Sequence, residues 1–128
     1  MTPTISIKNL HLEYQLWTRE LTFYKEEIKI YEDHLVNLVS RNTNPHFRIQ
    51  VEHFQNQFIL EKEVIDHLKH DLHISEKQLA AFAHDLSGFG LEMIKMDNHS
   101  SIRDRIFTFR KIYKDLKEEF RIFEAKWC

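Results

Sequence analysis

The sequence predicts an all-α fold, an up-down-up bundle of three long helices with antiparallel coiled-coil packing. Apolar residues recur at alternating spacings of three and four in three separate runs, which keeps each run on one face of a helix. The chain has only two glycines and two prolines, too few for a fold rich in turns or strands. Its 128 residues suit a single domain, spanning residues 1–128.

The first run predicts a helix over residues 6–41. Thr4 and Ser6 are competing N-cap residues, because their hydroxyls can accept hydrogen bonds from the first free backbone N–H groups. Asn42 can adopt the left-handed conformation that ends a helix. The apolar face of this helix comprises Leu10, Tyr14, Trp17, Leu21, Tyr24, Ile28, Tyr31, Leu35 and Leu38.

The second run predicts a helix over residues 45–86. Asn44 is placed to cap it, and Pro45 suits the first helical position, where its missing N–H costs nothing. Ser75 and Gln78 form a capping-box pattern, which leaves open a kink or restart near His73. The apolar face comprises Val51, Phe54, Phe58, Ile65, Leu68, Leu72, Leu79, Phe82 and Leu86.

The third run predicts a helix over residues 101–127, after a loop over residues 87–100. We expect the apolar residues of this loop, Leu91, Met93, Ile94 and Met96, to fold over the end of the bundle and close its core. Ser100 or Ser101 begins the helix. Its apolar face comprises Ile102, Ile106, Phe109, Tyr113, Leu116, Phe120, Phe123 and Trp127.

The tip of the first helical hairpin, residues 28–60, is a candidate interface. The short turn forces the first two helices to lie antiparallel, and the third helix is too short to reach the tip if Trp127 ends near the level of Glu61. An uncovered apolar patch of that size predicts a homodimer. The alternative is a bent second helix, which the third helix covers more fully. The expected interface residues are Tyr31, Leu35, Leu38, Phe47, Phe54 and Phe58.

Two polar residues interrupt the apolar face of the second helix. Helix pairing sets Ser75 near the level of three polar residues on the other helices, and such a layer can bind a small ligand or fix the helix register. Glu61 is the second interruption, and it either reaches solvent at the end of the bundle or faces a cavity with a shifted pKa. The candidate polar site is therefore His11, Tyr14, Ser75, Tyr113 and Glu61.

The nine histidines call for a test of metal-ligand spacing. No glutamate has a histidine three residues later, and no two histidines are four residues apart, which argues against the usual helical iron and zinc sites. The remaining candidates form a three-residue repeat whose alternative role is a solvated helix face. They are His67, His70 and His73, with Glu20 as a candidate carboxylate ligand.

Glu13, Glu20 and Glu27 recur every seven residues beside the apolar face of the first helix. Acids in this position usually form interhelical ion pairs, with a metal-ligand role as the alternative. The net charge of −2 is small, and residues 99–128 carry +3 while residues 45–86 carry −3. We therefore expect a basic helix beside an acidic one and do not favour a nucleic-acid partner; the alternative is that the basic third helix binds the phosphates of a nucleic acid.

The sequence indicates a non-enzymatic protein. It has no Gly-rich phosphate loop and no Gly-x-Ser-x-Gly elbow, and its one cysteine, Cys128, is an implausible nucleophile. We assign no catalytic residue and no required cofactor, although a transition metal remains an option. The absence of a signal peptide and of a long apolar segment predicts a cytoplasmic protein without a membrane partner.

The leading hypothesis is a helical interaction or scaffold protein that self-associates and has a further protein partner. The alternative is a helical bundle that binds a metal or small ligand through histidine with glutamate or tyrosine.

Overall fold

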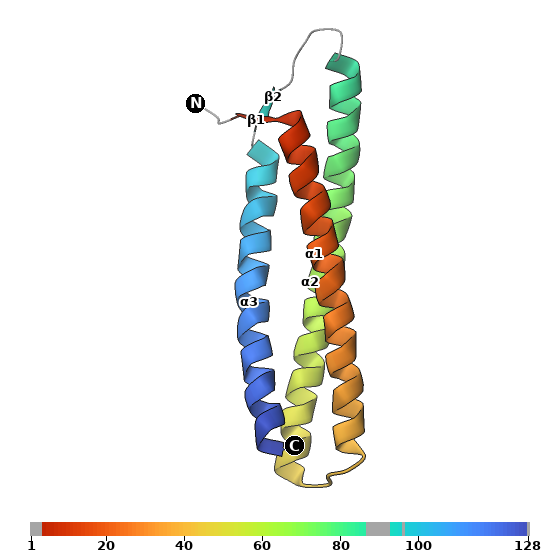
Figure 1. Ribbon diagram of the computed structural model, residues 1–128, viewed down its shortest axis with the longest axis vertical. Helices are drawn as coiled ribbons and strands as arrows, with labels where there is room; N and C mark the ends of the chain where they lie inside the picture. The colour runs from red at the N-terminus through yellow and green to blue at the C-terminus, as the bar shows by residue number, and fades with distance from the viewer. Residues whose placement is uncertain (1–3, 87–92, 96, 128) are drawn as a thin grey trace.

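The computed structural model describes residues 4–86, 93–95 and 97–127, with side chains described for residues 7–81 and 100–127. It confirms the predicted all-α bundle of three helices (Figure 1). In the view of Figure 1, helix α1 runs down, α2 returns upward beside it, and α3 runs down again. In chain order the elements are β1 Thr4–Ser6, α1 Ile7–Val39, α2 Pro45–Leu86, β2 Met93–Lys95 and α3 Asp97–Trp127.

The turn between α1 and α2 has the predicted capping. The Asn44 side-chain oxygen accepts a hydrogen bond from the His46 N–H at 2.8 Å, and Pro45 occupies the first helical position. The Asn42 side chain accepts a bond from the Asn44 N–H at 2.9 Å and tightens the turn. Helix α2 then continues to Leu86 without a break near His73. Within the described residues, none of the three helices is apolar enough over its length to cross a bilayer.

A short antiparallel ribbon joins the entrances of α1 and α3, which the sequence did not predict. Thr4 pairs with Lys95, Ile5 with Ile94 and Ser6 with Met93. As a result α3 begins at Asp97, four residues before the predicted start at 101. The expectation that Leu91, Met93, Ile94 and Met96 close the core concerns side chains that lie outside the described residues.

Helix α3 covers the hairpin tip, so the predicted uncovered tip is wrong. The Trp127 indole N–H donates a hydrogen bond to the Gln50 side chain at 2.8 Å, and Phe123 stacks on Phe47 with ring centroids 5.6 Å apart. The predicted interface residues Leu35, Leu38, Phe47, Phe54 and Phe58 are therefore buried inside one chain, and Tyr31 is half-buried against the same core.

The error lies in the register of α3 along α2. The sequence analysis placed Trp127 level with Glu61, whereas the structure places it beside Gln50, eleven residues nearer the turn. At 1.5 Å per residue this is a shift of about 16 Å. The pairing of β2 with β1 places the start of α3 beside the start of α1. Figure 1 shows the outcome: α2 extends beyond the start of α3, and the end of α3 lies beside the beginning of α2.

Candidate functional site

A ladder of paired polar side chains closes the seam between α1 and α3. The pairs are Glu13–Arg103, Glu20–Arg110, Glu27–Lys117 and His34–Glu124. Each partner on α3 lies 90 residues after its partner on α1, because the two helices run parallel and both repeat every seven residues. The predicted glutamate ladder is thus confirmed as interhelical ion pairs.

Two rungs of this ladder use the arginine fork. Arg103 donates two hydrogen bonds to Glu13, both at 2.9 Å, and Arg110 donates two to Glu20, at 2.6 and 2.7 Å. The bonds from Arg110 hold the pKa of Glu20 below its ordinary value of 4.5, although partial burial opposes this. The carboxylate of Glu20 is therefore already satisfied by a cation.

The third rung is reinforced from the core. The Tyr113 hydroxyl donates a hydrogen bond to Glu27 at 2.6 Å, beside the Lys117 ammonium at 2.9 Å from the same oxygen. Burial of Tyr113 raises the pKa of the phenol far above its ordinary value of 10.0, and the hydrogen bond to Glu27 adds to this effect. Tyr113 therefore acts as a permanent hydrogen-bond donor.

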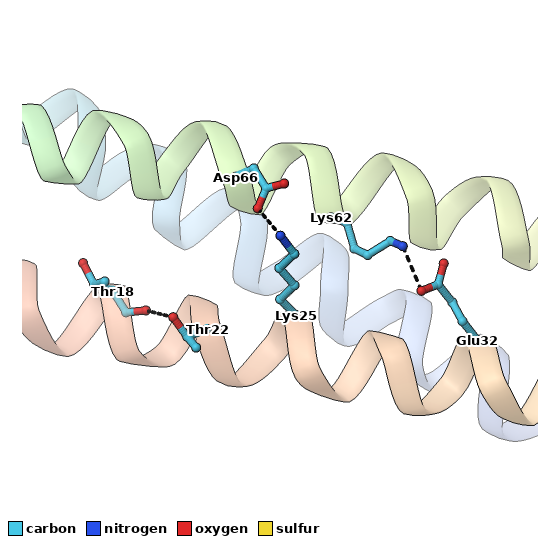
Figure 2. Close-up of polar contacts among 6 residues, drawn as sticks. All are labelled: Thr18, Thr22, Lys25, Glu32, Lys62 and Asp66. Carbon is cyan, nitrogen blue, oxygen red and sulfur yellow. Dashed lines mark hydrogen bonds and ion pairs between the residues drawn. The ribbon is translucent and has the colours of Figure 1, made fainter.

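The seam between α1 and α2 is also closed by charge. Lys25 lies 2.6 Å from Asp66, and Lys62 lies 2.9 Å from Glu32 (Figure 2). Figure 2 shows the two pairs crossing between the helices in opposite senses, with the lysine on α1 in one and on α2 in the other. Paired lysine and carboxylate side chains therefore cover this seam.

The seam between α2 and α3 is different, because its flanking pairs are interrupted between Asp71–Arg105 and His53–Glu119, whose atoms lie 3.9 Å apart. Asp71 pairs with Arg105 at 2.8 Å. One heptad nearer the turn, the corresponding positions hold Val64 and Ile112 instead, and both are part of an open groove with a volume of about 880 Å³. Its lining residues are Leu60, Glu61, Val64, His67, Leu68, Ser100, Ser101, Asp104, Arg105, Thr108, Phe109 and Ile112.

The groove has an apolar wall and one buried carboxyl. Leu60 and Ile112 are each about half exposed, at 50% and 48%, while Phe109 forms part of the buried floor. Glu61 is 5% exposed and is the one charged residue among the described side chains that is buried. Burial raises the pKa of Glu61 above 4.5, and among the described residues no hydrogen bond or ion pair offsets this effect.

The predicted polar site is divided between three places in the structure. Tyr14 lies near Ser75, and burial raises the Tyr14 pKa to about 12 while the Ser75 hydroxyl partly offsets the effect. His11 lies at the same place, 3.3 Å from Glu76, the residue after Ser75 on α2. Tyr113 belongs instead to the Glu27 rung, and Glu61 lies 14 residues before Ser75 on α2, in the groove. The five residues therefore do not form one layer.

The predicted metal ligands do not converge either. His67, His70 and His73 are exposed on α2, and Glu20 on α1 is engaged by Arg110. Among the residues that the structure describes, no group of three or more histidine, cysteine, aspartate or glutamate side chains is placed to share a metal ion. His67 lines the groove, whereas His73 lies in a separate depression beside His11 and Glu76.

Glu61 could be identified from the sequence, but the groove around it was not predicted. The available signal was the break in the charge pattern, because Leu60, Val64 and Ile112 are apolar at positions flanking the core. Using that signal requires the register of α3 on α2, which the sequence analysis had placed incorrectly.

Comparison with protein-family models, with curated proteins and with solved structures gave no match for this chain.

Proposed function

We propose that this protein is a non-enzymatic helical binding protein that takes up an apolar small molecule in the groove between α2 and α3. The observation that carries the proposal is the gap in the flanking ion pairs at Val64 and Ile112, which leaves apolar side chains open to solvent. Its volume of about 880 Å³ is in the range of small-ligand sites, which are mostly apolar with a few polar groups.

The proposal can be tested with N-phenyl-1-naphthylamine, an uncharged apolar dye that fluoresces when it leaves water. We expect saturable binding to the wild-type chain and loss of binding in Ile112→Glu, which puts a charge in the groove wall. Ile122→Glu is the matched control, because Ile122 is 72% exposed on the same helix and does not line this groove. Equal binding by both variants, or none by the wild type, would rule out the groove.

A second candidate function, self-association, is favoured by a separate observation on α1. Leu16, Phe23 and Ile30 are exposed, at 57%, 56% and 67%, and recur every seven residues on the face of α1 away from the core. Arg19 and Glu26 lie between them at the three- and four-residue spacing of a coiled-coil seam. A second copy of this chain is the partner that this face fits.

An antiparallel arrangement about Phe23 fits this face best. It sets Leu16 of each copy against Ile30 of the other, and it brings Arg19 of each copy near Glu26 of the other. Both charged residues are exposed in the single chain. The proposal retains the expected homodimer but moves its interface from the hairpin tip to the outer face of α1.

Sedimentation equilibrium over a range of concentrations tests this arrangement. We expect Phe23→Glu and Arg19→Glu each to shift the chain toward monomer, while Ile122→Glu leaves the association unchanged. The double exchange Arg19→Glu with Glu26→Arg should restore association, because it reinstates the opposite charges. A wild-type chain that is monomeric at all concentrations would exclude the candidate.

A further inference from the structure

We infer that the α2–α3 groove selects an organic cation with an apolar body, whose positive group pairs with Glu61. The inference rests on the proposed function, since it names the chemical class that the same groove would bind. Its starting point is a juxtaposition: a carboxyl buried to 5% exposure lines a groove that is otherwise apolar at that end.

Glu61 occupies a position where an apolar residue would serve the fold better. It replaces a core residue in the apolar stripe of α2, between Phe58 and Ile65, which are both fully buried. A carboxylate that is partly withdrawn from water without a partner is unfavourable, because it loses hydration and gains no compensating contact. A cation with its own apolar surface would compensate for the lost hydration, and the open groove gives it a route to the carboxyl.

The other charges around the groove agree with a cationic occupant. Asp104 adds a second carboxylate to the lining, and the guanidinium of Arg105 is engaged by Asp71 at 2.8 Å. The lysine beside Glu61 in sequence, Lys62, points to the other seam and pairs with Glu32. Figure 2 shows Lys62 reaching toward α1. Glu61 is thus the carboxyl beside the apolar wall, and Asp104 lies at the other end of the groove, next to Arg105.

The lining of the groove suits an occupant with an apolar body. Leu60, Val64 and Ile112 form its exposed apolar wall, and Leu68 and Phe109 its buried floor. An alkyl or aryl group can cover the wall, while an ammonium group reaches Glu61 at close range. Apolar contact alone would hold many molecules, so the carboxyl is the feature that supplies selectivity.

The test uses three probes that share one apolar chain and differ in the head group: n-octylammonium, n-octanol and n-octanoate. Their affinities for the wild-type chain are measured by isothermal titration calorimetry at pH 7.5. We expect n-octylammonium to bind at least about tenfold more tightly than n-octanol, which corresponds to about 1.4 kcal/mol. We expect n-octanoate to bind most weakly, because Glu61 and Asp104 repel it.

Two variants assign the preference to one carboxyl. Glu61→Gln keeps the shape and removes the charge, so the ratio of n-octylammonium to n-octanol affinity should fall to about one. Asp104→Asn is the matched control, because it removes the other carboxylate of the lining and should leave most of the ratio in place. The variant Glu61→Gln should fold, since it replaces a buried charge by a neutral amide of the same size.

The outcomes distinguish the preference for a cation from binding in the groove itself. Equal affinity for n-octylammonium and n-octanol in the wild type would overturn the cation preference while leaving an apolar groove that binds. A preference that survives Glu61→Gln and disappears in Asp104→Asn would assign it to Asp104 and overturn the role of Glu61. Failure of all three probes, together with failure of the uncharged dye, would remove the proposed function itself.

Discussion

Arg110 and Glu20 join α3 to α1 through two parallel hydrogen bonds, from Nε at 2.6 Å and from Nη2 at 2.7 Å. The same fork joins Arg103 to Glu13 one heptad earlier. Because the guanidinium is planar, the paired bonds fix the relative height and rotation of the two helices as well as their charge complementarity. The ladder therefore specifies the parallel register of α1 and α3.

A double-mutant cycle on Glu20→Gln and Arg110→Met should give a coupling free energy of about 0.5–1 kcal/mol. The value is modest because Arg110 is 38% exposed and Glu20 is 26% exposed, so water screens the pair. Arg110→Lys serves as the control that keeps the charge but loses the fork, and it should recover only part of the coupling. Urea unfolding provides the free energies, and a coupling of zero would show that the rung adds nothing to stability.

The acid limb of the stability curve should depend on Glu20. Its pKa is lowered in the folded chain, so the stability it contributes is present above pH 4.5 and is lost as the pH falls through the folded value. The Glu20→Gln variant should therefore lose less stability than the wild type as the pH falls below 4.5. Urea unfolding at a series of pH values measures both curves. Parallel curves would contradict the shift.

Glu61 should have the opposite effect on the pH dependence of stability. Its pKa is raised in the folded chain, so the carboxyl favours the folded state below pH 4.5, and this contribution is lost as the pH rises through the folded value. Replacing Glu61 by Leu should remove that dependence and raise the free energy of unfolding at pH 7 by about 1–3 kcal/mol. The comparison requires unfolding curves of both chains at pH 4 and pH 7. A less stable Glu61→Leu chain at pH 7 would contradict it.

Tyr113 should lose a strong hydrogen bond in the variant Tyr113→Phe. The ring keeps its packing, while Glu27 loses the phenol donor at 2.6 Å and retains Lys117. Because the bond is made to a charged acceptor, we expect a loss of about 1–2 kcal/mol, measured by urea unfolding. Tyr31→Phe is the control, since the Tyr31 ring packs on Phe120 and its hydroxyl makes no hydrogen bond among the described residues.

Phe120 should be among the most important core residues of α3. It is fully buried, and its ring centroid lies 5.3 Å from that of Phe54 and 5.2 Å from that of Phe58. The variant Phe120→Ala should lose about 3–5 kcal/mol of stability through lost contacts and a cavity. Ile122→Ala is the exposed control and should lose little. If Phe120→Ala stayed as stable as the wild type, α3 would not cover the hairpin tip.

The helices and their inward faces could be predicted from the sequence because both follow from local rules. The alternating spacing identified Leu21, Ile28 and Leu35 as core residues, and all three are buried to within 1% exposure. The Asn44–Pro45 start of α2 followed from the chemistry of helix ends and is present as expected. These features depend on residues that are close together in the sequence, so they can be predicted from it.

The register of α3 could not be predicted in the same way. It depends on where the chain goes between Leu86 and Asp97, and the apolar stripe of a helix fits its partner equally well after a slip of one or more heptads. In the structure the register is held by non-local contacts, namely the ladder with α1, the β1–β2 ribbon at one end and the Trp127–Gln50 bond at the other. The groove could not be predicted for the same reason, because Val64 and Ile112 lie opposite each other only in the correct register.

The constant separation of 90 residues along the ladder also restricts how chain length can change in evolution. Adding one residue inside α1 would rotate every later residue by about 100° and carry Glu20 and Glu27 off the seam. Whole heptads could be added to all three helices together without that effect. Residues could also be added freely in the turn before Pro45, which lies outside the repeats. Related sequences should therefore differ in length at the connections or in steps of seven.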